Sequence, residues 1–110
     1  MTLKTFAAFA AAAFMAAVAP ASAQTPAPIK VGFSMTLTGN TAPAGQQVLL
    51  ALQIWRDDVN AKGGLLGRPV ELVYYDDQGS PANAPGIYSK LVDVDKVDLL
   101  IGPYGTNVIA

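Results

Sequence analysis

The loop Gly102–Thr106 carries the strongest chemical signal in the sequence. It follows an apolar run, Val97–Ile101, and leads into residues suited to begin a helix. Peptide N–H groups at a place where a strand ends and a helix begins favour an anion, through unpaired donors and the helix dipole. The Thr106 hydroxyl would add a donor or would only cap the helix, and the two roles can coexist. Tyr104, in the same loop, could stack on a ligand.

A second loop of small and polar residues, Thr36–Pro43, follows the segment Ile29–Met35. Thr36, Thr38 and Gly39 could contact a ligand there or form a plain surface turn, and the turn is the simpler interpretation. No G-x-G-x-x-G motif lies between this segment and the residues that follow it, so a dinucleotide site is not supported. We expect no cofactor.

Asp76 and Asp77 form the only adjacent carboxylate pair that closes a predicted strand. Paired carboxylates could bind a hard cation or do acid–base work. Without further clustered acids, a solvated turn with an Asx-type hydrogen bond is favoured over both. The chain contains neither cysteine nor histidine. That excludes thiol catalysis, a histidine-based triad and zinc held by either residue type.

Two segments must position the Thr36–Pro43 loop. Apolar and polar residues alternate over Ile29–Met35, which predicts a strand. From Ala44 a helical period begins, which predicts an amphipathic helix that ends at Lys62–Gly64. Its apolar stripe, with Trp55 expected in the core, consists of Val48, Leu52, Trp55 and Val59.

The second half of the sequence predicts two further strands and two further helices. Val70–Tyr75 begins after a proline and mixes polar with apolar residues, which suits an edge strand. A helix is expected with Asn83 as its cap and with Ile87, Leu91 and Val94 facing the sheet. Val97–Ile101 suits a strand buried on both faces. This order of elements predicts an α/β fold: a parallel sheet with helices on both faces and right-handed crossovers.

The first 23 residues are typical of a secretory signal peptide. Lys4 supplies the basic start, Phe6–Val18 is apolar and uncharged, and Ala21–Ala23 is a small-x-small cleavage site. A membrane anchor is the alternative, but the run is shorter than the roughly 20 residues that span a bilayer. Residues 24–28 then form a Pro/Ala linker. Residues 29–110 would form part of the amino-terminal lobe of a ligand-binding domain. We expect a fragment of a longer protein, because the chain stops at the predicted start of a new helix.

Nothing in the charge or composition of the chain suggests nucleic-acid binding. The formal net charge is −1, and the basic residues are scattered rather than gathered in a run. Because the sequence contains no cysteine, we expect an exported protein that needs no disulfide and cannot carry the lipidated cysteine of a bacterial lipoprotein.

Four pieces of the sequence, taken in order, resemble one family. They are IKVGFSM with the following LTG, VNAKGGLLGRPVEL, VYYDDQGSP and VDLLIGPYGT. Together they resemble the amino-terminal lobe of periplasmic substrate-binding proteins of the branched-chain amino acid (leucine/isoleucine/valine) ABC-transporter type. The resemblance implies a partial lobe of a type I periplasmic-binding fold, in which two lobes close on a small ligand.

The resemblance also implies site residues. In such proteins the loop after the third strand holds the carboxylate of the ligand with hydroxyl and N–H groups, which here falls on Gly105 and Thr106, beside Tyr104. Thr38 belongs to the matching loop after the first strand. The family often has an aromatic residue where this chain has Ala44, and a proline where it has Asn40. These departures extend the expected solutes from branched-chain amino acids to an amide, a urea-like compound or an aromatic acid.

The sequence thus predicts a periplasmic solute-binding subunit of an ABC importer. Its partners would be a small solute that carries a carboxylate and a membrane permease, and the full-length protein would be a monomer. It would not be an enzyme. Two alternatives stay open: the ligand-sensing domain of a receptor or regulator with the same fold, and a secreted α/β enzyme that uses Asp76 and Asp77.

Overall fold

The computed structural model describes residues 24–109. The predicted signal peptide, Met1–Ala23, lies outside the described residues. Residues 24–28 belong to no helix or strand, and Arg68 holds the end of this segment by donating to the carbonyl groups of Ala27 (2.8 Å) and Pro28 (3.0 Å). The elements that follow are β1 (Ile29–Met35), α1 (Ala42–Ala61), β2 (Val70–Asp76), α2 (Ala84–Asp93), β3 (Leu99–Leu100) and α3 (Thr106–Ile109).

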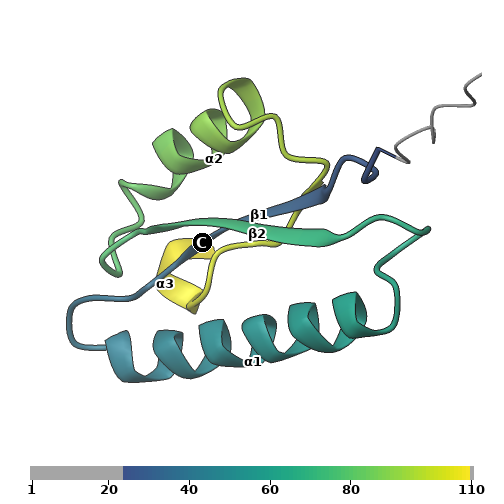
Figure 1. The fold of residues 1–110 in the computed structure, drawn as a ribbon. Coiled ribbons are helices and arrows are strands. Elements are labelled where there is room, and N and C mark those ends of the chain that lie inside the picture. Colours follow the sequence, from purple (N-terminus) through teal and green to yellow (C-terminus); the bar gives the residue numbers. More distant parts are fainter. Residues whose placement is uncertain (1–23, 110) are drawn as a thin grey trace, which may run out of the picture.

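The strands form a parallel sheet in the order β2-β1-β3. Helices α1 and α2 lie on opposite faces of this sheet (Figure 1), so the predicted α/β class and layer order are confirmed. In the described part of the chain β2 is an edge strand, as predicted. Among the helices of residues 24–109, none has the length and apolarity to cross a membrane.

The core is built around β1, which is buried on both faces. Phe33 is fully buried, and its ring stacks on Tyr74 of β2 with 5.3 Å between the ring centroids. On the α2 side, Gly32 leaves room for Leu91 and Val97, because a Cβ atom on Gly32 would lie 2.9 Å from Val97. The alternating pattern therefore identified the strand, and the small residues between its apolar ones let α2 approach closely.

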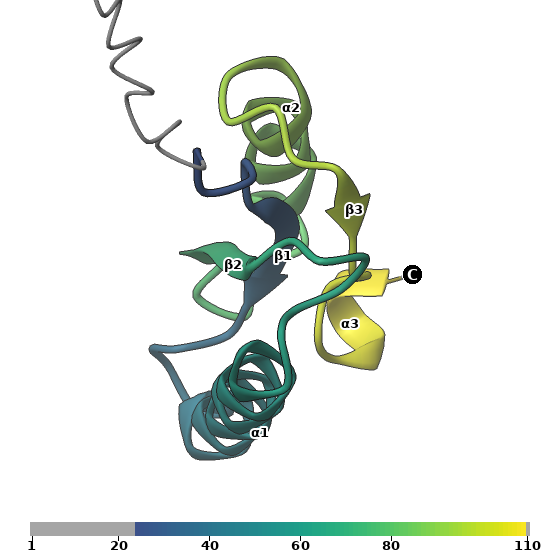
Figure 2. The ribbon, with the colours of Figure 1, turned by 45° about the vertical axis from the view of Figure 1, so that its right-hand side comes forward.

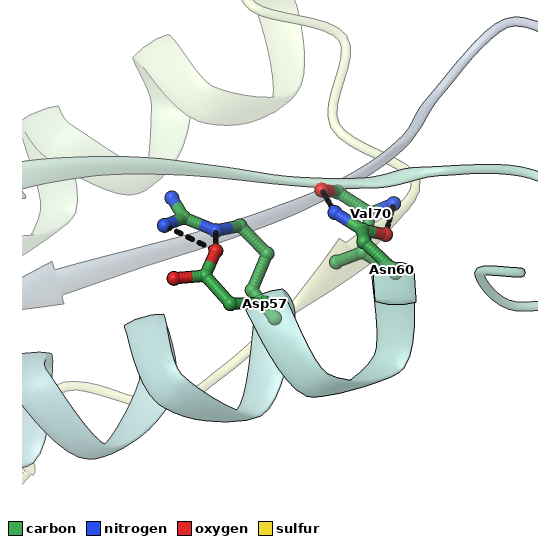
Figure 3. Close-up of polar contacts among 4 residues, drawn as sticks. Asp57, Asn60 and Val70 are labelled. Carbon is green, nitrogen blue, oxygen red and sulfur yellow. Dashed lines mark hydrogen bonds and ion pairs between the residues drawn. The ribbon is translucent and has the colours of Figure 1, made fainter. Parts of the chain in front are cut away.

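Helix α1 begins at Ala42, two residues before the predicted start, and ends as predicted. Gly63 and Gly64 have left-handed backbone angles, and their N–H groups donate to the carbonyl groups of Asn60 and Val59. This is a Schellman cap. Near the same end, Asn60 fastens α1 to the start of β2: its side chain donates to the Val70 carbonyl (2.9 Å) and accepts from the Val70 N–H (2.7 Å), as Figure 3 shows.

Two predicted core positions are wrong. Trp55 is 38% exposed, because α1 packs mainly against β2 and β1 and leaves this part of its stripe incompletely covered. Val94 is 68% exposed, because α2 ends at Asp93 and Val94 lies in the turn that follows the helix. Leu91, on the same predicted stripe, is fully buried as expected.

The prediction for β3 is also wrong in part. The strand pairs with β1 as expected, but it is short, and Leu99 and Leu100 are about half exposed rather than buried on both faces. Figure 2 shows β3 at the side of the sheet, above α3. Within residues 24–109, β1 is its only strand neighbour. In the described residues, the apolar side chains of β3 are therefore not buried, although the sequence predicts that they are.

Candidate functional site

A hollow of about 430 Å³ lies between the start of α1 and the loop that joins β3 to α3. One wall comes from residues that follow β1, and the other from residues that follow β3. Both walls stand at the carboxyl ends of parallel strands, where ligands bind in open α/β sheets. The lining residues are Asn40, Thr41, Pro43, Ala44, Tyr104, Gly105, Thr106 and Asn107.

The first wall depends on a close contact between α1 and the exit of β1. Thr41 accepts the N–H groups of Ala44 and Gly45 at its carbonyl, which forms the first turn of α1. Gly45 is buried against the carbonyl group of Thr36: a Cβ atom on Gly45 would lie only 1.9 Å from that oxygen. Glycine at this position therefore lets Pro43 and Ala44 stand over the hollow.

The second wall is the turn that begins α3. Gly105 has a left-handed backbone angle (φ 99°), and its carbonyl accepts the N–H groups of Val108 and Ile109. The N–H groups of Thr106 and Asn107 come before these first helical donors. Together with the Thr106 hydroxyl, they give this wall donors that suit a carboxylate, while Tyr104 offers an aromatic surface.

A third loop supports both walls from behind. Gly79, which follows β2, accepts a hydrogen bond at its carbonyl from the Asn107 side chain (3.0 Å). A Cβ atom on Gly79 would be 3.4 Å from the Thr36 methyl group and 3.6 Å from the Thr41 hydroxyl. The end of β2 thus contacts the loops that follow β1 and β3.

The solvated turn predicted for Asp76 and Asp77 is wrong for Asp77. Its carboxylate has no exposed surface and accepts hydrogen bonds from the hydroxyl groups of Ser34 (2.6 Å) and Thr36 (2.7 Å). The Asx-type hydrogen bonds are confirmed: Asp76 accepts from the N–H of Gln78 (2.8 Å), and Asp77 from that of Gly79 (2.9 Å). Neighbouring hydroxyl groups, which no local pattern reveals, explain why Asp77 is buried.

The Asp76 carboxylate also accepts hydrogen bonds from a hydroxyl group and from backbone N–H groups, but it is less buried than Asp77. Burial works against its charge, but donors from the Thr38 hydroxyl and from the N–H groups of Leu37, Gln78 and Thr38 hold its pKa below the ordinary value of 3.8. The Thr38 hydroxyl lies 2.6 Å from the carboxylate, and the Leu37 nitrogen 2.9 Å. Asp76 thus fixes the first part of the loop that leads to α1.

Tyr88 of α2 joins β1 to the exit of β3. Its hydroxyl accepts from the Ser34 N–H (3.3 Å) and donates to the Ile101 carbonyl (2.5 Å). Burial raises the pKa of the Tyr88 hydroxyl, the charge of Asp77 adds to the rise, and hydrogen bonds to Ser34 oppose it. The hydroxyl stands where the ladder between β1 and β3 would otherwise continue, which explains why β3 ends at Leu100.

The structure brings four of the five predicted site residues to one hollow: Ala44, Tyr104, Gly105 and Thr106. It does not bring Thr38 there, since its hydroxyl is bonded to Asp76. Sequence reasoning gave no site role to Thr41, Pro43 and Asn107. Asn107 follows Thr106 directly in the sequence, and this adjacency is the signal that could have identified it.

Comparison with known proteins gives a family match. A family model described as "Periplasmic binding protein" matches residues 28–110. Among curated relatives, the Leu/Ile/Val-binding protein BraC3 of Rhizobium johnstonii is 37% identical over 108 residues, which are 98% of this chain and 28% of that protein. The chain thus spans about a quarter of the length of the curated relatives it matches.

Solved structures agree with this match. The branched-chain amino acid transporter substrate binding protein LivJ of Streptococcus pneumoniae, in complex with isoleucine, is 31% identical with a TM-score of 0.70, over 74% of this chain and 23% of that one. An ABC transporter solute binding protein of R. palustris, in complex with benzoate, is 33% identical with a TM-score of 0.63, over 74% of this chain and 22% of that one.

Proposed function

The chain belongs to the periplasmic binding protein family, and on that premise we propose that it is the amino-terminal part of an exported solute-binding subunit of an ABC importer. The subunit captures a small solute between two lobes and presents the closed form to a membrane permease. Residues 29–110 supply one side of the cleft. Closure of a second lobe over the hollow would bury the solute, as in hinge-type binding proteins.

One observation carries this proposal: the hollow joins donor groups and apolar groups at the carboxyl end of the sheet. The Thr106 hydroxyl and the N–H groups at the start of α3 would hold a carboxylate. Pro43, Ala44 and Tyr104 would contact the apolar part of the solute. Thr38 would act indirectly, by holding the loop that carries the first wall.

The solute we propose is a branched-chain amino acid or a related small polar compound. The Rhizobium relative is named for leucine, isoleucine and valine, and two similar structures hold isoleucine and benzoate. Ala44 has a small side chain on the wall of the hollow, which leaves room for a larger group such as the ring of an aromatic acid. An amide or a urea-like compound would use the same polar wall.

Export and assembly complete the proposal. Met1–Ala23 would direct the protein to the periplasm, residues 24–28 would link it to the folded part, and the full-length protein would act as a monomer with its permease. No bond is made or broken. The arrangement of Asp76 and Asp77 supports a role without catalysis, because both carboxylates already accept hydrogen bonds from neighbouring groups.

Titration calorimetry of the mature full-length protein tests this function. The solutes are L-leucine, L-isoleucine, L-valine, benzoate, acetamide and urea. We expect Thr106→Ala to weaken binding of the carboxylate solute by about 1–3 kcal/mol, because a charged group loses one hydrogen bond.

Thr25→Ala is the matched control, since Thr25 is exposed in the linker and far from the hollow in sequence. It should leave the affinity unchanged. Equal affinities of wild type and Thr106→Ala would remove Thr106 from the site. If no solute in the set binds to the wild-type protein, the proposed solute class is wrong.

A further inference from the structure

Asp77 is a buried carboxylate that the proposed function does not use. It has no exposed surface, and its two oxygen atoms have different partners. Oδ1 accepts from the Thr36 hydroxyl (2.7 Å) and the Gly79 N–H (2.9 Å), whereas Oδ2 accepts from the Ser34 hydroxyl (2.6 Å). A buried carboxylate is costly unless such hydrogen bonds compensate it. The Asp77 carboxylate therefore fixes the positions of its three donors, Thr36, Gly79 and Ser34, relative to one another.

The first partner of Oδ1 leads to the wall formed by α1. Thr36 is almost fully buried, and its carbonyl oxygen lies against Gly45, where a Cβ atom would be 1.9 Å away. Gly45 directly follows Ala44 in the wall of the hollow. Any shift of Thr36 would therefore change how closely α1 approaches the exit of β1.

The second partner of Oδ1 leads to the opposite wall. Gln78 and Gly79 are consecutive residues with left-handed backbone angles (φ 58° and 68°), a conformation that is unfavourable for a residue with a side chain such as Gln78. The N–H bonds to Asp76 and Asp77 hold this turn. In this conformation the Gly79 carbonyl accepts the Asn107 side chain at 3.0 Å.

We infer that Asp77 is a positioning residue of the solute pocket: its Oδ1 atom sets the spacing of the two walls, one through Thr36 and the other through Gly79. Asp77 itself never touches the solute. This inference rests on the proposed function, because it concerns the same hollow. It assigns a task to the Asp76–Asp77 pair that neither a cation site nor acid–base chemistry describes.

The division of partners between the two oxygen atoms supplies a matched pair of variants. Thr36→Val and Ser34→Ala each remove one buried hydroxyl group from the same carboxylate. Thr36 contacts the first wall directly through Gly45. Ser34 lies within β1, and its link to the exit of β3 runs through the Tyr88 hydroxyl. If Asp77 contributed only to stability, the loss of affinity in each variant would simply follow its loss of folding stability. Two variants with similar losses of stability would then lose similar amounts of affinity.

The experiment measures the affinity of the full-length protein for L-isoleucine by calorimetry and its stability by denaturant unfolding without solute. We expect Thr36→Val to weaken binding about tenfold and Ser34→Ala less than about threefold, at comparable losses of stability. Thr36→Ser keeps the hydroxyl group and should restore the affinity to within about twofold of wild type.

A second pair tests the other wall and serves if Thr36→Val does not fold. Gly79→Ala and Gly67→Ala both place a side chain on a left-handed residue (φ 68° and 72°), so they carry similar backbone strain. Gly67 has open space around it and lies in the Leu65–Arg68 turn. Only Gly79→Ala should weaken the binding of L-isoleucine.

Two results would overturn the inference: equal losses of affinity within each pair, or an unchanged affinity in Thr36→Val and Gly79→Ala. Amide NMR signals of Ala44 and Asn107 in the unliganded protein separate this inference from the proposed function. Thr36→Val should shift both signals and Ser34→Ala neither, whether or not L-isoleucine binds. Absence of binding in the wild type, with these shifts present, would overturn the solute class alone.

Discussion

Two threonines that the sequence places in similar loops have different surroundings in the structure. Both follow a strand by a few residues, and both were candidates for contact with a solute. Thr106 lines the hollow, whereas the Thr38 hydroxyl donates to Asp76 at 2.6 Å. The difference arises because β2 ends beside the loop that follows β1 and presents a carboxylate there. At the scale of single residues, the neighbour across the sheet decides what a hydroxyl group does.

Replacement of Thr38 by valine tests this assignment. The Thr38 hydroxyl is the first of the donors that lower the pKa of Asp76, so Thr38→Val should raise that pKa toward its ordinary value of 3.8. NMR titration of the Asp76 carboxyl carbon in the full-length protein measures the shift. An unchanged pKa would show that the N–H donors alone hold the charge.

The sign of the pH dependence follows from the same shift. A folded-state pKa below the unfolded value means that Asp76 stabilises the folded state above pH 3.8 and loses this contribution as pH falls through the folded-state pKa. Below pH 3.8, the free energy of unfolding, measured by denaturant unfolding at several pH values, should therefore depend less on pH in Thr38→Val than in wild type.

At the scale of elements, the start of α1 is set by one close approach. Gly45 permits the helix to touch the Thr36 carbonyl, and this contact places Pro43 and Ala44 over the hollow. The sequence shows Gly45 only as a weak helix former near a helix start. Glycine is required at this position because the Thr36 carbonyl, directly after β1, leaves no room for a Cβ atom.

Gly45→Ala should destabilise the protein by about 2 kcal/mol or more, because the added methyl group would overlap a backbone oxygen. Gly86→Ala is the matched control within α2: a Cβ atom there meets nothing within 4 Å, and better helix propensity should stabilise by about 0.5–1 kcal/mol. Denaturant unfolding of both variants gives the comparison. A neutral Gly45→Ala variant would contradict the packing described for α1.

Helix α2 shows the same dependence on its neighbours. Asn83 stands at the predicted cap position, yet its side chain donates to the Asp77 carbonyl at 3.0 Å instead of capping the helix. Tyr88, one of the half-buried residues of α2, ends the β1–β3 ladder by bridging Ser34 and Ile101. Side chains of α2 and of the residue before it thus bind the backbone where β2 and β3 end.

At the scale of the whole molecule, residues 24–109 hold a sheet with an open, apolar edge. Leu99 and Leu100 of β3 are about half exposed, and Ile109 of α3 is more exposed still. An unpaired apolar strand edge is a liability in an isolated domain. The matched relatives are several times as long as this chain, which leaves ample sequence to cover such an edge.

We therefore expect residues 24–110, produced alone, to be marginally stable and to unfold over a broad temperature range. Calorimetry of this piece beside the full-length protein measures the difference. The full-length protein should show a sharp transition. A sharp, cooperative transition of the piece alone would contradict the expectation.

The sequence by itself determined the elements, their order and the fold class. Alternation in Ile29–Met35, helical spacing from Val48 to Val59 and the glycines after Lys62 are local signals, and local signals dictate local structure. They were sufficient to predict the edge strand, the cap of α1 and the loop at Gly105 and Thr106.

Only the tertiary structure decided burial and the roles of individual polar groups. Asp77 is buried because Ser34 and Thr36, more than 40 residues earlier, compensate its charge. Trp55 is 38% exposed because, within residues 24–109, the packing of α1 on β2 and β1 covers this part of the helix incompletely. Such outcomes depend on which segments meet across the sheet. The spacing of residues along the chain does not reveal which segments pack together. The hollow and the buried carboxylate of Asp77 are therefore seen only in the tertiary structure.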